Sequence, residues 1–212
     1  RREIGEYRKY LGELADAGVD GVLAANWGML QLVREMGGMP LYGDTPLNLT
    51  NLAAFKTAKE LGLEQAAASQ EIPMEQLTGL INLSDLPVEV VVHGTQAAMT
   101  INHDLVSVIG EQALEGRERF YRFPRLYLED EAGEVYQVEI DQYRRTHLLM
   151  SQQLCLLPYL PFLLAQHPAS LRLELQFTDA RETGRLVEVY RRHIDTAAKD
   201  PAGFKVAQPD WD

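Results

Sequence analysis

The chain has 212 residues, 46% of them hydrophobic, so it can bury a substantial core as one domain or slightly more. Its 20 basic and 31 acidic residues give a formal net charge of −11, which provides no general attraction for nucleic-acid phosphates or anionic membranes. The single cysteine, Cys155, excludes an intrachain disulfide and an all-thiolate metal site within one copy, and no apolar run approaches the ~20 residues of a membrane span.

The first half of the chain alternates short, buried-type strands with amphipathic helices. One helix ends near Gly18, and each predicted strand is separated from the next by a further helix. The helical spacing predicts that Leu30, Val33, Leu52, Phe55 and Leu61 point inward, and that Thr50 or Asn51 caps the helix at residues 48–61. Short strands that alternate with helices are typical of a parallel sheet with right-handed crossovers. We therefore predict four strand–helix units within residues 1–117, with strands at residues 19–25, 39–43, 64–69 and 88–92.

The pattern changes at residue 118. Residues 125–129 and 134–140 alternate apolar with polar side chains, and a Gly-containing turn joins them at residues 130–133. This arrangement predicts an antiparallel β-hairpin. We place the hairpin in an insertion at residues 118–150, with a further short strand near residues 147–150.

The α/β pattern resumes after the insertion and closes the fold over residues 151–198. Two prolines interrupt a short predicted helix at residues 154–166. Residues 170–177 alternate in the manner of a strand, which we expect to be a later strand of the same sheet. A helix follows at about residues 179–198 and is expected to bury Leu186, Val187, Tyr190 and Ile194. We expect residues 199–212 to form a flexible tail.

Each of the first four predicted strands ends in a polar residue. In a barrel of alternating strands and helices, the carboxyl ends of the strands form the functional face. Strand tilt turns these ends toward a common axis, so the four side chains are expected to converge on one pocket. The ordinary alternative is that strand ends are polar because they meet water. The four residues are Asn26, Asp44, Glu71 and His93.

His93 is the strongest catalytic candidate, because an imidazole at a strand end can act as an acid or a base near neutral pH. Glu71 on the neighbouring strand end could orient that imidazole or hold it charged. Each residue also has an ordinary interpretation. His93 could be a half-buried histidine hydrogen-bonded to Glu71, and Glu71 could be a carboxylate stabilised by a helix N-terminus.

Other reactive side chains give weaker signals. His103 and Asp104 suggest a metal site, but no third ligand is obvious, which favours surface polar residues. Cys155 lies among leucines and is typical of a packed small hydrophobe rather than a nucleophile. The sequence contains no GxSxG, HExxH, P-loop or GxGxxG pattern, so it gives no support to a serine hydrolase, a zincin or a nucleotide-binding site.

Several local strings resemble peptidase family U-32, the collagenase-like proteases. The family strings QLNVTN and SPEL correspond to residues 46–51 and 69–72, and VHGALCMSYSGRC corresponds to residues 92–104. The strings DLCL and RIEGR correspond to residues 153–156 and 172–176. These matches occur in the same order over nearly all of the chain. Each string alone is weak, but together they make a strong resemblance.

The resemblance implies a partial TIM-like (β/α) barrel whose first units precede Arg1, so we expect the chain to be a fragment of a longer protein. It implies that related proteins bind an iron–sulfur cluster through four cysteines. Several such proteins are linked to oxygen-independent hydroxylation of RNA bases or of a quinone precursor, and others are described as proteases. We take His93, Glu71 and Glu174 as catalytic candidates. The ligand-binding candidates are Asn26, Asp44, Asn48 and Gln176.

The chain departs from the family pattern at the cluster ligands. Asp104 and Ala97 occupy positions where the family has cysteine, and the Cys-rich segment that should follow is missing. Leu175 and Gln176 replace a glycine and an arginine. One cysteine cannot hold a four-thiolate cluster, so we expect no iron–sulfur cofactor and no other metal.

Three functions are consistent with these observations. The first is a cluster-less, divergent or auxiliary U-32 protein with a small-ligand pocket at the barrel mouth. Its partner would be the missing N-terminal barrel strands or a cluster-bearing relative. The second is a hydrolase (protease) or hydroxylase-type enzyme that acts through His93 and Glu71. The third, a nucleic-acid-modifying domain, is disfavoured by the net charge and the missing cluster, so nucleic acid is an unlikely partner. The single cysteine fits a reducing cytoplasm, and we expect a cytoplasmic protein that does not bind a membrane.

Overall fold

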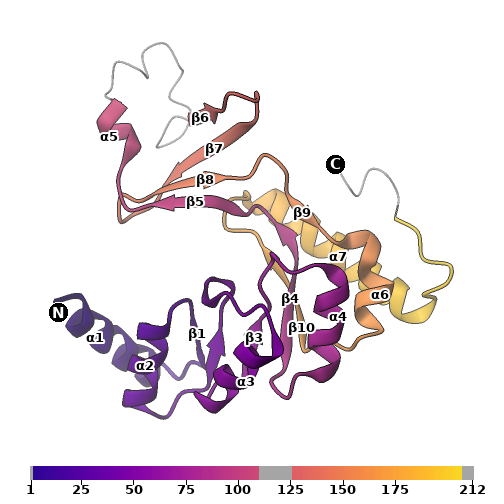
Figure 1. Ribbon diagram of the computed structural model, residues 1–212, viewed down its shortest axis with the longest axis horizontal. Helices are drawn as coiled ribbons and strands as arrows, with labels where there is room; N and C mark the ends of the chain where they lie inside the picture. Colours follow the sequence, from indigo (N-terminus) through magenta and orange to yellow (C-terminus); the bar gives the residue numbers. More distant parts are fainter. Residues whose placement is uncertain (1, 110–125, 207–212) are drawn as a thin grey trace. The chain divides into compact units, whose positions relative to one another are not determined.

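The computed structural model describes residues 2–109 and 126–206, which divide into two compact units (Figure 1). The first unit comprises Arg1–Val92, Leu156–Leu173 and Gly184–Asp212, and the second comprises His93–Cys155 and Glu174–Thr183. The predicted boundary at residues 117 and 118, and the end of the predicted tail, lie outside the described residues.

The first unit contains a parallel sheet in the order β1-β2-β3-β4-β10. The pairs β1–β2, β2–β3 and β3–β4 are all parallel, which confirms the predicted order and direction of the first four strands. β10 follows β4 in the same sheet, also as predicted. The sheet curls into a half-barrel, and the described strands do not close a TIM barrel (Figure 1).

The strands of this sheet are short, and helices connect them. The strands are β1 (Val22–Ala24), β2 (Leu41–Gly43), β3 (Gln65–Ala67), β4 (Val88–Gly94) and β10 (Ser170–Glu174). The helices before β4 are α1 (Arg2–Asp16), α2 (Trp27–Met36), the 3₁₀ turn η1 (Thr45–Leu47), α3 (Leu52–Glu60) and α4 (Met74–Leu83). The later ones are the 3₁₀ turn η3 (Leu157–Tyr159), α6 (Leu160–Leu164) and α7 (Ala180–Lys199).

Side-chain caps fix where several of these helices begin. The Asn26 side chain accepts a hydrogen bond from the Met29 backbone N–H at 2.8 Å, and Asn51 accepts one from Ala54 at 3.0 Å. These contacts satisfy backbone donors that the first turn of a helix leaves without partners. Asn51, one of two residues predicted to cap α3, is therefore the cap.

The core of the first unit lies between the helices and the outer face of the sheet. Phe55, Leu30 and Val33 are almost completely buried, as the helical spacing predicted. Two predicted inward residues were wrong, since Leu52 and Val187 are exposed. The buried residues of α7 instead follow a stripe three to four residues apart, which is the spacing of one helix face. They are Leu186, Val189, Tyr190, His193 and Ala197.

The second unit is built on an antiparallel sheet in the order β5-β8-β7-β6. Its strands are β5 (Ala97–Ile101), β6 (Leu126–Glu129), β7 (Val135–Ile140) and β8 (Thr146–Leu149). The predicted hairpin is confirmed by the pairing of β6 with β7, and the further strand near residue 147 is confirmed as β8. β5 was not predicted, because its residues, Ala-Ala-Met-Thr-Ile, do not alternate apolar with polar side chains. The short helix α5 (Leu105–Ile109) and strand β9 (Leu154–Cys155) complete this unit.

The turn between β7 and β8 is organised by Asp141. Its carboxylate accepts hydrogen bonds from the backbone N–H groups of Tyr143 and Arg145, each at 2.9 Å, and from the Arg145 side chain at 2.7 Å. The His147 ring lies 3.2 Å away. Burial alone would raise the pKa of Asp141, but the donors from Arg145, His147 and Tyr143 outweigh it and hold the pKa well below its usual value.

Within residues 2–109 and 126–206, none of the helices combines the length and the apolar character that crossing a membrane would require.

Candidate functional site on the inner face of the parallel sheet

One face of the parallel sheet carries a set of side chains that do not belong to the apolar core. In the register of the sheet, Leu23 pairs with Tyr42, Tyr42 pairs with Gln65, and Ala67 pairs with Glu89. Because side chains alternate across a strand, these residues lie on the face opposite to buried Ala24, Leu41 and Val88. This is the inner face of the half-barrel.

Arg172 of β10 is the centre of a hydrogen-bonded network on the inner face. Its guanidinium lies 2.7 Å from Asp44 Oδ1 and 3.2 Å from Glu89 Oε1. The Ser170 hydroxyl donates to Glu89 Oε2 at 2.6 Å, and the Gln65 amide donates to Ser170 Oγ at 2.8 Å. All three charged side chains are mostly buried, which strengthens their attraction relative to a surface pair. The network therefore links strands β3, β4 and β10 with the Asp44 loop after β2.

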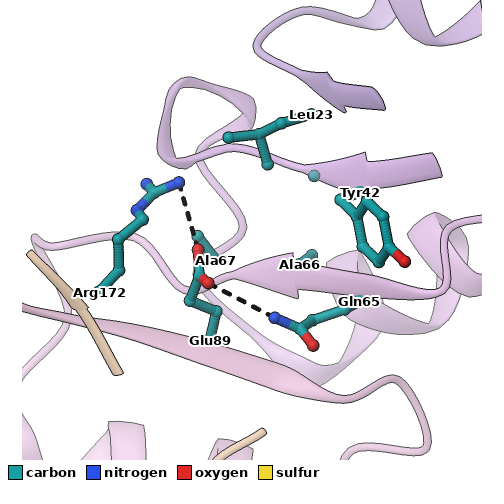
Figure 2. A pocket seen from close by; sticks show the side chains of 8 residues that line it. Leu23, Tyr42, Gln65, Ala66, Ala67, Glu89 and Arg172 are labelled. Carbon is teal, nitrogen blue, oxygen red and sulfur yellow. Dashed lines mark hydrogen bonds and ion pairs between the residues drawn. The ribbon is translucent and has the colours of Figure 1, made fainter. Parts of the chain in front are cut away.

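A cavity of about 140 Å³ lies beside this network. Figure 2 shows the Arg172–Glu89 ion pair on one side of it and the Tyr42 ring on the other, with the Gln65 amide between them and Leu23 across the hollow. The lining residues are Leu23, Tyr42, Gly43, Gln65, Ala66, Ala67, Glu89 and Arg172. The cavity is thus partly apolar, with charged and amide groups along one wall.

Asp44 is the one sequence-predicted site residue that joins this network. It also accepts a hydrogen bond from the Thr45 N–H at 2.7 Å and so caps η1. Three other candidates of the first unit do not line the cavity. Asn26 caps α2, Asn48 ends η1 with a left-handed φ of 53°, and Glu71 is exposed in the turn before α4.

The remaining candidates belong to the second unit. His93 is buried near the end of β4, with 7% of its surface exposed, and it pairs directly with Cys155 of β9 in antiparallel register. Glu174 ends β10, and Gln176 is exposed in the turn that follows. His93 thus belongs to the second unit, and Glu71, with which it was expected to share a pocket, belongs to the first.

Gly94 shows how closely Glu174 approaches the end of β4. Its φ of 141° is a conformation that other residues rarely adopt, and a Cβ there would collide with the backbone carbonyl and Cβ of Glu174. A glycine at this position permits a tight exit from the strand. In the structure it also makes room for Glu174.

Sequence reasoning missed two pairings. Arg172 and Glu89 had a local signal, since each is a charged residue inside an apolar strand, but their partnership spans 83 residues of chain (172 − 89) and has no local pattern. No sequence pattern predicted that Cys155 would meet a histidine, yet the β4–β9 register places Cys155 directly opposite His93. Directly opposite residues of an antiparallel pair have neighbouring side chains.

The suggested metal site at His103 and Asp104 has another explanation in the structure. Asp104 forms an ion pair with Arg144 at 2.7 Å, and the His103 carbonyl accepts a hydrogen bond from Thr146 Oγ1 at 2.6 Å. In the part of the chain that the structure describes, no group of three or more His, Cys, Asp or Glu side chains is arranged to hold a metal ion.

Comparison with known proteins assigns the whole chain to one family. The model of peptidase family U32 matches residues 1–212. A protein named tRNA hydroxylation protein P2 from Bacillus subtilis is 20% identical, and the alignment covers 99% of this chain and 69% of that protein. The tRNA hydroxylation protein P1 of the same organism is 24% identical, with 95% of this chain and 48% of that protein covered.

A third relative matches a shorter stretch. The tRNA hydroxylation protein P of Escherichia coli is 29% identical over 86 residues, which is 40% of this chain and 19% of that protein. The chain therefore spans 69% or less of each of these relatives. No solved structure matches.

The residues present do not fit the iron–sulfur cluster that the family resemblance implies. A cubane cluster needs four thiolates or close substitutes. These 212 residues contain one cysteine, and Cys155 lies within the β4–β9 pair rather than among further sulfur ligands. No chemical step is therefore assigned to a cluster bound by this chain.

Proposed function

Because the chain belongs to peptidase family U32, we propose that it acts in tRNA hydroxylation as a component that holds no iron–sulfur cluster of its own. The names of its relatives carry this proposal, since two tRNA hydroxylation proteins align with nearly the whole chain. The number of cysteines supports the absence of a cluster, because one cysteine cannot ligate a four-thiolate cluster.

In this proposal the chain is the auxiliary U32 protein expected from its sequence, with a small-ligand pocket on the half-barrel. Its net charge of −11 opposes strong binding of tRNA by this component alone. The tRNA and the redox chemistry would then be handled by a cluster-bearing relative. The natural location of such a pair is the cytoplasm, where tRNA is found.

The partner would dock at the β1 edge of the half-barrel. Within the described residues, β1 is the first strand in the sheet order and pairs with β2 alone. An open strand edge offers backbone donors and acceptors to a further strand. Apolar residues of α1, the helix that precedes β1 in the chain, are exposed as well, including Ile4 and Tyr10. We propose that a parallel strand of a cluster-bearing relative occupies this edge.

Deletion of the coding region tests the role. Mass spectrometry of nucleosides from total tRNA should show loss of a hydroxylated nucleoside in the deletion strain and its return on complementation. A complementing copy with Cys155→Ser should restore the modification fully if this chain holds no cluster. An unchanged nucleoside profile in the deletion strain would refute the role.

A cysteine-dependent hydrolase is the second candidate, because the structure places Cys155 opposite His93. A histidine beside a thiol can remove its proton and make it a nucleophile. In this case iodoacetamide should alkylate Cys155 more slowly in a His93→Gln variant than in the wild type. An equal rate would mean that His93 does not activate the thiol, and the hydrolase would lose its structural basis.

A further inference from the structure

We propose that the cavity on the inner face of the parallel sheet binds a small organic cation with a flat apolar body, such as an aromatic amine with a protonated amino group. The inference rests on the proposed small-ligand pocket and names its residues and ligand class. It does not depend on the role in tRNA hydroxylation. Every residue that carries it lies in the first unit.

The charge of the network favours a cation. Arg172 contributes one positive charge, while Asp44 and Glu89 contribute two negative charges, so the sum is −1 beside the cavity. The guanidinium is already shared between two carboxylates. An anionic ligand would have to displace one of them, whereas a cationic ligand can approach Glu89 and complete its neutralisation.

The hydrogen-bonding groups of the wall favour a donor. Within the described part of the chain, the carbonyl oxygen of the Gln65 amide and the Tyr42 hydroxyl make no hydrogen bonds, while the Gln65 NH₂ group donates to Ser170. Glu89 accepts from Ser170, from Arg172 and, at 3.5 Å, from the Gln65 amide (Figure 2), and it keeps further acceptor capacity because a carboxylate can accept about four hydrogen bonds. An ammonium group, which has three donors and no acceptor, matches these oxygens.

The apolar part of the wall sets the size and shape of the ligand. Leu23 and Ala67 present hydrocarbon, and the Tyr42 ring offers a surface on which a cation or a flat ring can lie. The volume of about 140 Å³ is close to that of the engineered cavity of about 150 Å³ that binds benzene. A single aromatic ring with one short amino substituent therefore fits.

The test is an NMR titration of the isotope-labelled chain with three probes of equal shape: benzylamine, benzyl alcohol and benzoate. Benzylamine should cause saturable shifts at the amides of Tyr42, Gln65 and Glu89. Benzyl alcohol should bind roughly tenfold more weakly, because it lacks the charge-assisted hydrogen bond to the carboxylate. Benzoate should cause no saturable shift.

Two variants localise the effect. Glu89→Gln should weaken benzylamine binding roughly tenfold, while Glu75→Gln, a matched change at an exposed position of α4, should leave it unchanged. If Glu89→Gln fails to fold, Tyr42→Leu keeps every charge and should still weaken binding. The absence of saturable shifts at the cavity, or equal binding of benzoate, would overturn the inference. Neither result would bear on tRNA hydroxylation, which the nucleoside analysis tests separately.

Discussion

The parallel sheet of the first unit and the antiparallel sheet of the second unit are stabilised by different means. Helices cover the outer face of the parallel sheet, where large apolar side chains such as Phe55 and Leu30 are fully buried. The four strands of the antiparallel sheet bury few residues, chiefly Val138, Thr146 and Leu149. Their conformation depends more on hydrogen-bonded turns. In the turn between β7 and β8, the Asp141 carboxylate alone accepts three hydrogen bonds from Tyr143 and Arg145.

This difference predicts where substitutions should lower the free energy of unfolding most. Burial stabilises roughly in proportion to the apolar area removed from water, so core changes in the first unit should have large effects on unfolding. A single hydrogen bond contributes about 0.5–1.5 kcal/mol, so changes in the turns of the second unit should have smaller and more local effects.

The largest expected effect comes from truncating the core. Phe55→Ala should lower the free energy of unfolding by about 3–5 kcal/mol, because it removes a fully buried ring and leaves a cavity. Urea denaturation followed by circular dichroism measures the change. Leu83→Ala, at a residue of α4 that is 69% exposed, is the control and should change stability by less than about 0.5 kcal/mol. Equal losses would remove the contrast between core and surface.

A somewhat smaller effect is expected on the inner face. Arg172→Met should destabilise the first unit by about 3 kcal/mol, because it leaves Asp44 and Glu89 as buried carboxylates without their shared cation. Arg191→Met is the matched control, since its ion pair with Asp195 is exposed on α7 and should be worth less than about 1 kcal/mol. A similar change in both variants would show that the inner network is no stronger than a surface pair.

Gly94→Ala should have an intermediate effect of about 2 kcal/mol, because its φ of 141° is unfavourable for alanine and the added Cβ would meet Glu174. Gly79→Ala offers the opposite control. That glycine lies inside α4 with no atom near the new Cβ, so alanine should stabilise the helix by about 0.5–1 kcal/mol. Thermal unfolding of the two variants should therefore shift in opposite directions.

The smallest effect should be confined to the second unit. Asp141→Asn weakens the turn between β7 and β8, so amide hydrogen exchange in these strands should become about fivefold faster at neutral pH. The folded-state pKa of Asp141 lies below its unfolded value, so its contribution is present above about pH 4 and is lost as the pH falls further. The acid dependence of exchange should therefore be weaker in the variant. Slower or unchanged exchange would show that the turn does not limit the sheet.

The sequence predicted much of the fold because the relevant signals were local. The helical spacing located Phe55 and Leu30 in the core, and the Gly-containing turn located the β6–β7 hairpin. β5 carried no such signal, since Ala97 and Ala98 are followed by exposed Met99. Its strand conformation depends on pairing with β8, which lies some 45 residues further along the chain.

The candidate site was less predictable for the same reason. Polar residues at strand ends were expected to converge on one pocket. Instead Asn26 caps the start of α2, Asn48 ends η1, and Asp44 accepts a hydrogen bond from Arg172 of β10. Capping and ligand binding use the same residue types, so sequence alone could not separate them. The proximity of Arg172, Glu89 and Gln65 depends on how the sheet curls, which no short string encodes.

The double role of Asp44 has a consequence for how this sequence can drift over evolutionary time. Asp44→Asn would keep the η1 cap and weaken the contact with Arg172. Loss of Arg172 alone would leave the carboxylates of Asp44 and Glu89 mostly buried without a cation between them. Joint replacement of all three charges by uncharged side chains, with asparagine at position 44 to keep the cap on η1, is far less costly than loss of Arg172 alone. Positions 44, 89 and 172 should therefore mutate as a correlated group, with single-charge variants appearing only as short-lived intermediates between charged and uncharged versions of the same wall.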